Sequence, residues 1–334
     1  MLFYALRRLA FALPTLLVIS LAVFALMALA PGDPMAQLPL TIPAEVRAEM
    51  RSALGLDAPF HVRYGLWLWQ LVVVEPRVAL EALLGLEGTD APRILSWQTR
   101  APVFQLIAQR LPQTLTVVGL AYLLGIAVAL PLGIWSAYRQ NSTFDRAGNA
   151  IALLGVAVPP FFSGAVLIYV FSIRLEWLPS IYDTTLSVTD WNSLWEQARQ
   201  MLLPVAVLSL QTTAQITRYM RAAMLDALGQ DYVRAARAKG LSERAVLMGQ
   251  AARTSLIPVV SVIALGAPQV FAGAIITEQI FGVNGVGQLL ISSIRASDLP
   301  TVQTITMLLA ALIILANLLA DLAYGLLDPR VRYD

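Results

Sequence analysis

Six stretches of the 334-residue sequence contain no charged residue and run for 18 residues or more. Crossing the roughly 30 Å hydrocarbon core of a bilayer takes about 20 apolar residues in a helix. Proline recurs within several of these runs, which neighbouring helices in a membrane can accommodate. We therefore predict an all-α integral membrane protein with six transmembrane helices, at Leu9–Ala30, Leu111–Tyr138, Ala147–Ile173, Gln200–Thr217, Thr254–Thr277 and Leu299–Ala320.

The composition agrees with a chain that lies in the lipid bilayer. Only 13% of the residues are charged, whereas soluble domains average about 25%. A formal net charge of +2 gives no indication of nucleic-acid binding. The first apolar run is longer than the roughly 7–15 residues of a signal-peptide core. We therefore interpret residues 1–30 as an N-terminal end followed by a retained first transmembrane helix.

Lysine and arginine are distributed unevenly between the segments that join these runs. With an even number of spans both termini lie on one side, and that side carries 13 of the 23 basic residues. The two short loops opposite carry three. Because short cytoplasmic segments are enriched in basic residues, we predict that both termini and the 218–253 segment are cytoplasmic.

Residues 31–110 form the one long segment expected on the extracytoplasmic side. The stretch "TIPAEVRAEMRSALGL" predicts a short amphipathic helix that Thr41 caps and Gly55 ends. The stretch "VRYGLWLWQLVVV" predicts either an interfacial helix or a small helical cap packed on itself. The whole segment is therefore expected to be a helical insertion between the first and second spans.

Several kinds of catalytic site are missing from the sequence. The single lysine, Lys239, is followed by Gly240 and Leu241, so no Walker-type phosphate loop exists. One histidine and no cysteine leave no Cys/His metal set and no thiol nucleophile. We predict that the chain is not an enzyme and holds no metal or cofactor of its own.

Polar residues within the apolar runs are candidates for a transport path. Gln211 and Gln215 are four residues apart and share a helix face. Two acidic residues, Glu278 and Asp321, lie at the ends of the last two spans, where water is near. Each of these side chains is open to two interpretations. It has a structural role, between helices or at a helix end, or it contacts a transported solute. The predicted path residues are Gln211, Gln215, Gln269, Glu278 and Asn317.

The loop 218–253 is too polar for the bilayer and rich in alanine, a strong helix former. Gly240 is expected to end one helix, and Ser242 to cap the next. The pattern therefore predicts a helix, a sharp turn and a second helix. By spacing alone this is either a solvated hairpin or a docking site for another protein.

Within that loop, "RAARAKG" resembles the E-A-A-x-x-x-G signature of ABC-importer permeases, with Arg234 in place of the Glu. Further stretches resemble the dipeptide/oligopeptide/nickel family of these permeases from end to end. In chain order they are "ALAPGDP", "LGLDAPFHVRY", "PVFQLIAQRLPQTL", "DYVRAARAKGLSERAVL", "TSLIPVV", "TEQIFGVNGVGQLL" and "DLAYGLLDPRVR". Two features depart from the family pattern, namely Asn284, where Pro is usual, and a longer 75–100 region.

The resemblance implies a type I ABC-importer permease subunit in a bacterial-type inner membrane, with residues 111–334 as the permease core. The implied partners are a second permease subunit, two ATP-binding subunits that hold ATP and Mg, and an extracytoplasmic solute-binding protein. Peptides are the leading substrate class that it implies. The coupling contact with the ATP-binding subunit would comprise Asp231, Tyr232, Arg234, Ala235, Ala236, Arg237, Lys239, Gly240, Leu241 and Ser242.

An ion-coupled secondary transporter is the alternative hypothesis from another class. It would work without ATP and move ions through Glu278 or Asp321. A requirement for ATP separates the two hypotheses.

Overall fold

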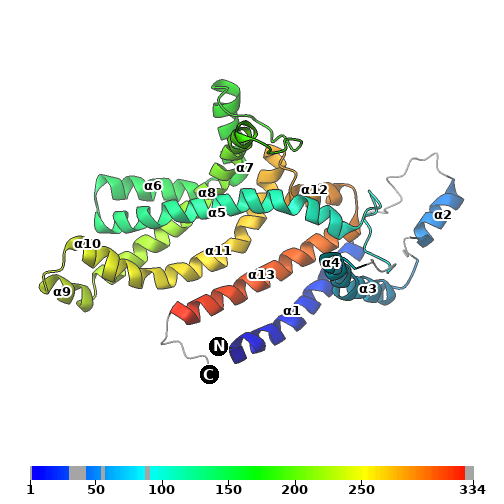
Figure 1. Cartoon of the computed structure of the whole chain (residues 1–334), viewed down its shortest axis with the longest axis horizontal. Helices are drawn as coiled ribbons and strands as arrows, with labels where there is room; N and C mark the ends of the chain where they lie inside the picture. The colour runs from blue at the N-terminus through cyan, green and yellow to red at the C-terminus, as the bar shows by residue number, and fades with distance from the viewer. Residues whose placement is uncertain (1, 30–42, 54–56, 87–90, 328–334) are drawn as a thin grey trace. The chain divides into compact units, whose positions relative to one another are not determined.

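The computed structural model describes residues 2–29, 43–53, 57–86 and 91–327, and these parts are helical apart from connecting loops (Figure 1). Contacts divide the chain into two units. The larger comprises Pro112–Gln288 with Met1–Leu9 and Ile313–Asp334, and the smaller comprises Ala10–Leu111 with Leu289–Leu312. The helices are α1 (Leu2–Leu29), α2 (Ala44–Ala53), α3 (Phe60–Trp69), α4 (Glu75–Leu84), α5 (Val103–Tyr138), α6 (Thr143–Ala157), α7 (Pro160–Leu167), α8 (Trp191–Leu228), α9 (Asp231–Ala238), α10 (Glu243–Ala245), α11 (Ala252–Phe281), α12 (Val286–Arg295) and α13 (Leu299–Leu327).

Three π-helical segments continue α-helices without a break, namely Gln70–Val74, Ile168–Arg174 and Val246–Ala251. In the insertion, α2 confirms the expected short helix, while its expected ends, Thr41 and Gly55, lie outside the described residues. The "WLW" stretch is helical as expected, with Trp67 buried and Trp69 exposed.

Four helical segments are long and apolar enough to cross a membrane: Ala10–Leu29, Val103–Tyr138, Glu243–Gly266 and Leu299–Leu319. Two bent helix pairs raise that number to six if each pair is one span. One pair is α6 with Pro160–Arg174, and the other is Ala274–Phe281 with α12. The all-α membrane fold is therefore confirmed. The fourth expected span, Gln200–Thr217, lies in the 38-residue α8, which is not among these segments.

The third expected span is not a continuous helix. The axes of α6 and Pro160–Arg174 differ by 106°. Val158 precedes Pro159 and has an extended backbone (ψ 121°), and Pro159 is also extended (ψ 143°), because a residue before proline avoids the helical region. Pro160 then opens α7, where its missing N–H costs nothing.

The long helix α8 organises the larger unit, since it packs against α6, α7 and α11. It also lies close to α5: a Cβ added at Gly133 would come within 2.6 Å of Met220 Cβ, and one at Gly125 within 2.8 Å of Thr212 Cβ. Such small residues let membrane helices approach closely. Asp190 is the N-cap of α8. Its carboxylate accepts a hydrogen bond from the backbone N–H of Ser193, which lowers the pKa of Asp190.

Candidate functional site

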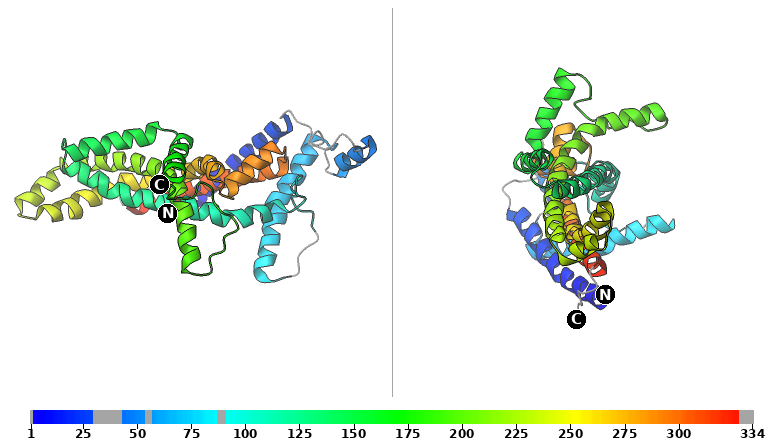
Figure 2. Two further views of the ribbon diagram at one scale, coloured as in Figure 1. Left: turned by 90° about the horizontal axis from the view of Figure 1, so that it is seen from above. Right: turned by 90° about the vertical axis from the view of Figure 1, so that its left-hand side faces the viewer.

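The hairpin formed by α9 and α10, residues 231–245, lies at one end of the larger unit (Figures 1 and 2). Its inner face joins a hydrophobic core that α5, α8 and α11 also supply. Val233 is fully buried and Ala236 is 7% exposed, and both pack into that core with Val246 and Leu247. The rest of the hairpin is exposed.

A Schellman motif ends α9. The N–H of Leu241 donates to the carbonyl oxygen of Ala236 at 3.3 Å, and the N–H of Gly240 donates to that of Arg237 at 3.0 Å. Gly240 has φ +78°, which a side chain other than Asn or Asp rarely tolerates. Ser242 then caps α10, and its hydroxyl oxygen accepts the N–H of Ala245 at 3.4 Å. The predicted helix–turn–helix is confirmed, with Gly240 and Ser242 in the expected roles.

Two ion pairs form within the hairpin. Arg237 Nε lies 3.0 Å from Glu243 Oε1, across the turn. Arg234 pairs with Asp231 one turn earlier. Tyr232, Lys239 and Leu241 are exposed, so the expected contact residues lie on an accessible surface.

Ala236 differs from the other predicted contact residues, because it faces the protein's own core. The side of α9 opposite Val233 and Ala236 carries Asp231, Arg234, Ala235 and Ala238. Ala238 was not among the predicted contact residues, although its spacing of three from Ala235 places both on one face. The small outward surface of α9 is therefore formed by Ala235 and Ala238.

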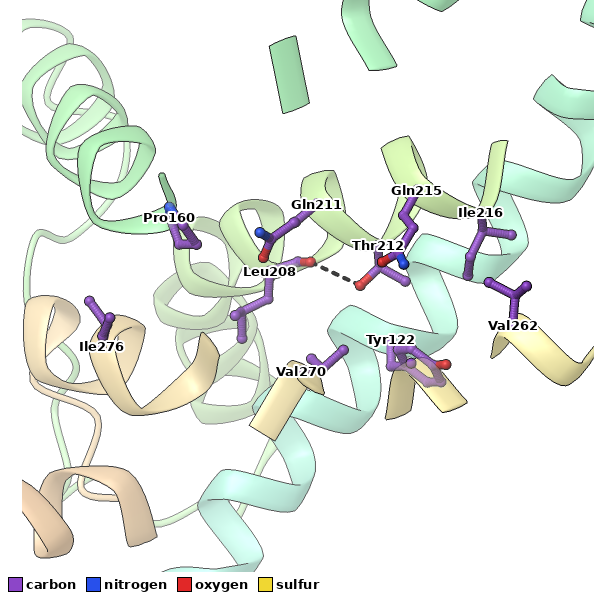
Figure 3. A pocket seen from close by; sticks show the side chains of 11 residues that line it. Tyr122, Pro160, Leu208, Gln211, Thr212, Gln215, Ile216, Val262, Val270 and Ile276 are labelled. Carbon is purple, nitrogen blue, oxygen red and sulfur yellow. Dashed lines mark hydrogen bonds between the residues drawn. The ribbon is translucent and has the colours of Figure 1, made fainter. Parts of the chain in front are cut away.

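A second feature is a cavity of about 300 Å³ between α5, α7, α8 and α11 (Figure 3). Gln211 and Gln215 both line it, as the four-residue spacing predicted. Its wall also includes the phenol of Tyr122, whose hydroxyl donates to the carbonyl oxygen of Ile263. The remaining lining is mostly aliphatic, which makes the two amides the principal polar groups.

The same two glutamines line a further cavity of about 620 Å³ on α8. Its other lining residues are more polar and include Asn149 of α6 with Arg218, Tyr219 and Arg221 of α8. Gln211 and Gln215 therefore stand where an apolar cavity and a polar one meet.

The other predicted path residues lie elsewhere. The side chain of Gln269 is outside the described residues. Asn317 is half-buried on α13 and lines neither cavity. Asp321, which was considered as an ion-coupling residue and not as a path residue, pairs with Arg8, and both lie within the larger unit.

Glu278 is buried, so the expectation that water is near this side chain is wrong. The residue is 1% exposed. Its Oε1 accepts the hydroxyl of Thr114 at 2.7 Å, and its Oε2 accepts the N–H groups of Gly287 at 2.8 Å and Gln288 at 3.1 Å. A carboxylate at a helix N-terminus satisfies N–H groups that have no partner within the helix. Glu278 therefore holds the start of α12.

Gly287 makes room for this arrangement. A Cβ at this position would lie 2.6 Å from Ile275 Cα and 2.8 Å from Glu278 Oε2. Replacing a helical glycine by alanine usually adds stability, but Gly287→Ala is expected to lower it by about 1–3 kcal/mol because a backbone atom blocks the methyl group. Thermal unfolding in detergent measures this, with Gly119→Ala in α5, where nothing lies within 4 Å, as the matched control. Equal midpoints for the two variants would contradict the packing described.

A buried ion pair that the sequence did not predict joins α6 to α8. Asp145 of α6 is 2% exposed, and Arg221 of α8 reaches its two carboxylate oxygens at 2.6 and 2.7 Å. The hydroxyl of Ser136, the N–H of Asn141 and the amide of Asn149 donate to the same carboxylate. A Ser142-x-x-Asp145 capping pattern was the one sequence signal for it.

Comparison with known proteins agrees with this geometry. Residues 129–333 match the family model described as "Binding-protein-dependent transport system inner membrane component", and residues 1–118 match a model of the N-terminal part of such membrane components. The oligopeptide transport system permease protein AppB of Bacillus subtilis (strain 168) is 35% identical over 331 residues, 99% of each chain. A peptide permease protein of Brucella suis biovar 1 (strain 1330) is 38% identical over 335 residues, again 99% of each chain.

Among solved structures, the MetNI methionine ABC transporter in inward-facing conformations has a similar fold. The TM-score is 0.52 at 16% sequence identity, over 67% of this chain and 97% of that one. At this identity the likeness concerns the fold.

Proposed function

The chain belongs to the family of inner-membrane components of binding-protein-dependent transport systems, and on that premise we propose that it forms half of the translocation path of an ATP-driven importer for small peptides or a related solute. The observation that carries the proposal is the exposed α9–α10 hairpin. Only the inner face of the hairpin packs against the core of the larger unit, and its other residues are exposed. A rigid, outward-facing helix with small residues suits docking into a groove of an ATP-binding subunit.

In this proposal the chain hydrolyses nothing. Two ATP-binding subunits on the side of the hairpin bind ATP and Mg. A second permease subunit completes the path, and an extracytoplasmic solute-binding protein delivers the solute. Both termini then face the cytoplasm, as the distribution of basic residues favours. ATP binding would move the hairpin, and the helices joined to it would switch the side on which the path is open.

The peptide class is supported by the names of the two relatives. Gln211 and Gln215 suit such a solute, because an amide both donates and accepts hydrogen bonds, as a peptide backbone does. We propose these two side chains as the contacts of the path.

The ion-coupled alternative has less support. It needs an acidic side chain that meets both water and the path. Glu278 is buried at the start of α12, Asp321 pairs with Arg8, and neither lines the cavities around Gln211 and Gln215. Both carboxylates have structural partners instead.

Uptake into proteoliposomes tests the proposal. The chain is reconstituted with the products of its adjacent genes and a labelled di- or oligopeptide is supplied with the binding protein. Uptake is expected to require ATP on the side of the membrane where the ATP-binding subunits lie. It is expected to persist when ionophores collapse the ion gradients. Uptake that continues without ATP, stops with ionophore and is lost in Glu278→Gln would support the ion-coupled alternative instead.

A further inference from the structure

The smaller unit contains a cavity of about 390 Å³ that the proposed transport path does not use. Its wall comes from the end of α1, from α3, from the loop before α5 and from the start of α13. Three arginines line it, Arg63, Arg93 and Arg100, and no acidic residue appears among the described lining residues. The cavity is therefore suited to an anion.

Buried contacts behind the cavity hold the side chain of Arg93 and the loop that carries Arg100. Arg93 Nη2 donates to Glu75 Oε2 at 2.7 Å, and Glu75, which is 2% exposed, also accepts the N–H of Ile94 at 3.1 Å. The loop that carries Arg100 is fixed by Asp298, which accepts the hydroxyl of Ser96 and, at 2.9 Å, the N–H of Trp97. Glu75 and Asp298 are thus occupied by these contacts, and among the described residues no carboxylate pairs with Arg63 or Arg100.

Within the described part of the chain, two buried donors beside this cavity have no acceptor, namely the indole Nε1 of Trp67 and the Nε of Arg93. Trp67 is 5% exposed and both residues belong to the cavity wall. Buried N–H groups are ordinarily hydrogen-bonded, and leaving them without a partner carries a free-energy cost. A ligand with several acceptor oxygens would remove part of that cost.

The candidate spans place the cavity near a membrane surface. Phe24 is near the end of the candidate span Ala10–Leu29, and Leu299 begins the candidate span Leu299–Leu319. With both termini on one side, the end of the first span and the start of the last face the same surface. Tryptophan is enriched at this depth, and an arginine near a helix end can extend its guanidinium group to the interface. The wall also has an apolar part, formed by Phe24, Leu66, Leu95 and Leu299.

We propose that this cavity binds the headgroup of an anionic phospholipid. The arginines contact the phosphate, since guanidinium groups pair with phosphate oxygens in a planar, bidentate fashion. One acyl chain lies along the apolar part of the wall. The bound lipid would fix the insertion to the bilayer beside the first and last spans. This inference holds whatever solute the path carries.

The test uses the full chain, purified and exchanged into nanodiscs of dioleoylphosphatidylcholine with a minor fraction of dioleoylphosphatidylglycerol. Lipids retained after extraction into detergent are counted by native mass spectrometry. The wild type is expected to retain phosphatidylglycerol in preference to phosphatidylcholine. The double variant Arg63→Gln/Arg100→Gln is expected to lose at least about tenfold of that preference. Neither substitution removes the buried Arg93–Glu75 pair, so the fold is preserved.

Arg77→Gln is the matched control, because Arg77 lies in α4 of the same unit, is exposed and does not line the cavity. Its lipid preference should equal that of the wild type. Equal retention of the two lipids by the wild type, or an equal loss in Arg77→Gln, would overturn the proposal. Displacement of the lipid by glycerol 1-phosphate alone would identify a soluble phosphate as the ligand, and displacement by an acidic peptide would identify a protein partner, so either result also overturns it.

Discussion

Asp145→Ala is expected to destabilise the folded chain by about 3–5 kcal/mol, the cost of removing one partner from a buried ion pair. The carboxylate is 2% exposed and accepts five hydrogen bonds from side chains and backbone, two of them from Arg221. Without it the guanidinium of Arg221, whose side chain is 21% exposed, keeps its charge with no counter-ion. Thermal unfolding in detergent should show a midpoint far below that of the wild type.

Asp231→Ala provides the matched comparison. Asp231 also pairs with an arginine, but its side chain is 93% exposed, and exposed pairs contribute about 0–1 kcal/mol. The double variant Asp145→Leu/Arg221→Met should recover much of the loss, because apolar side chains of similar size can replace a buried pair. A small effect of Asp145→Ala, or a double variant no better than the single, would show that the pair contributes little.

The Asp145–Arg221 pair marks a limit of sequence analysis. Its two members are 76 residues apart, and the capping pattern at Ser142 and Asp145 does not indicate Arg221 as the partner. The apolar runs predicted that α6 and α8 exist, but not which faces meet. The contact depends on how α8 is rotated against α5 and α6, which the tertiary packing decides. A charged residue beside an apolar run could equally have remained in water.

Local chemistry was predicted more successfully than long-range contacts. Gly240 ends α9 with a positive φ and Ser242 caps α10, since both effects depend on neighbours within five residues. Gln211 and Gln215 share a cavity because helical periodicity alone brings them together. The Pro159–Pro160 pair was a local signal for the bend between α6 and α7. Membrane helices tolerate single prolines, but it was wrong to extend this tolerance to two consecutive prolines.

Glu278 shows why position along a span is a poor guide to burial. At the end of an expected helix it should meet water, but the chain turns back at Gly282 and α12 follows. The N–H groups at the start of α12 then supply the hydrogen bonds that a buried carboxylate needs. That partner exists only because the helix pair is bent.

The largest functional effect is expected at the outward face of α9. Ala235→Arg should leave the fold intact, because Ala235 is exposed, α9 accepts arginine readily and surface substitutions usually change stability by under about 0.5 kcal/mol. The same side chain should prevent close approach of an ATP-binding subunit. We expect co-purification of that subunit to weaken by at least about 30-fold and ATP-driven uptake to be lost. Ala82→Arg, at an exposed alanine of α4, is the matched control.

Gly240 variants separate the shape of the turn from the contact itself. Gly240 has φ +78° and nothing within 4 Å of an added Cβ, so Gly240→Arg would both strain the turn and add bulk, and is expected to abolish transport. Asparagine tolerates this backbone conformation, so Gly240→Asn should preserve the hairpin and retain most of the partner binding. Loss in Ala235→Arg with retention in Gly240→Asn would identify the α9 face as the contact. Normal binding and transport in Ala235→Arg would exclude that face, since a long charged side chain cannot be accommodated between two closely packed helices.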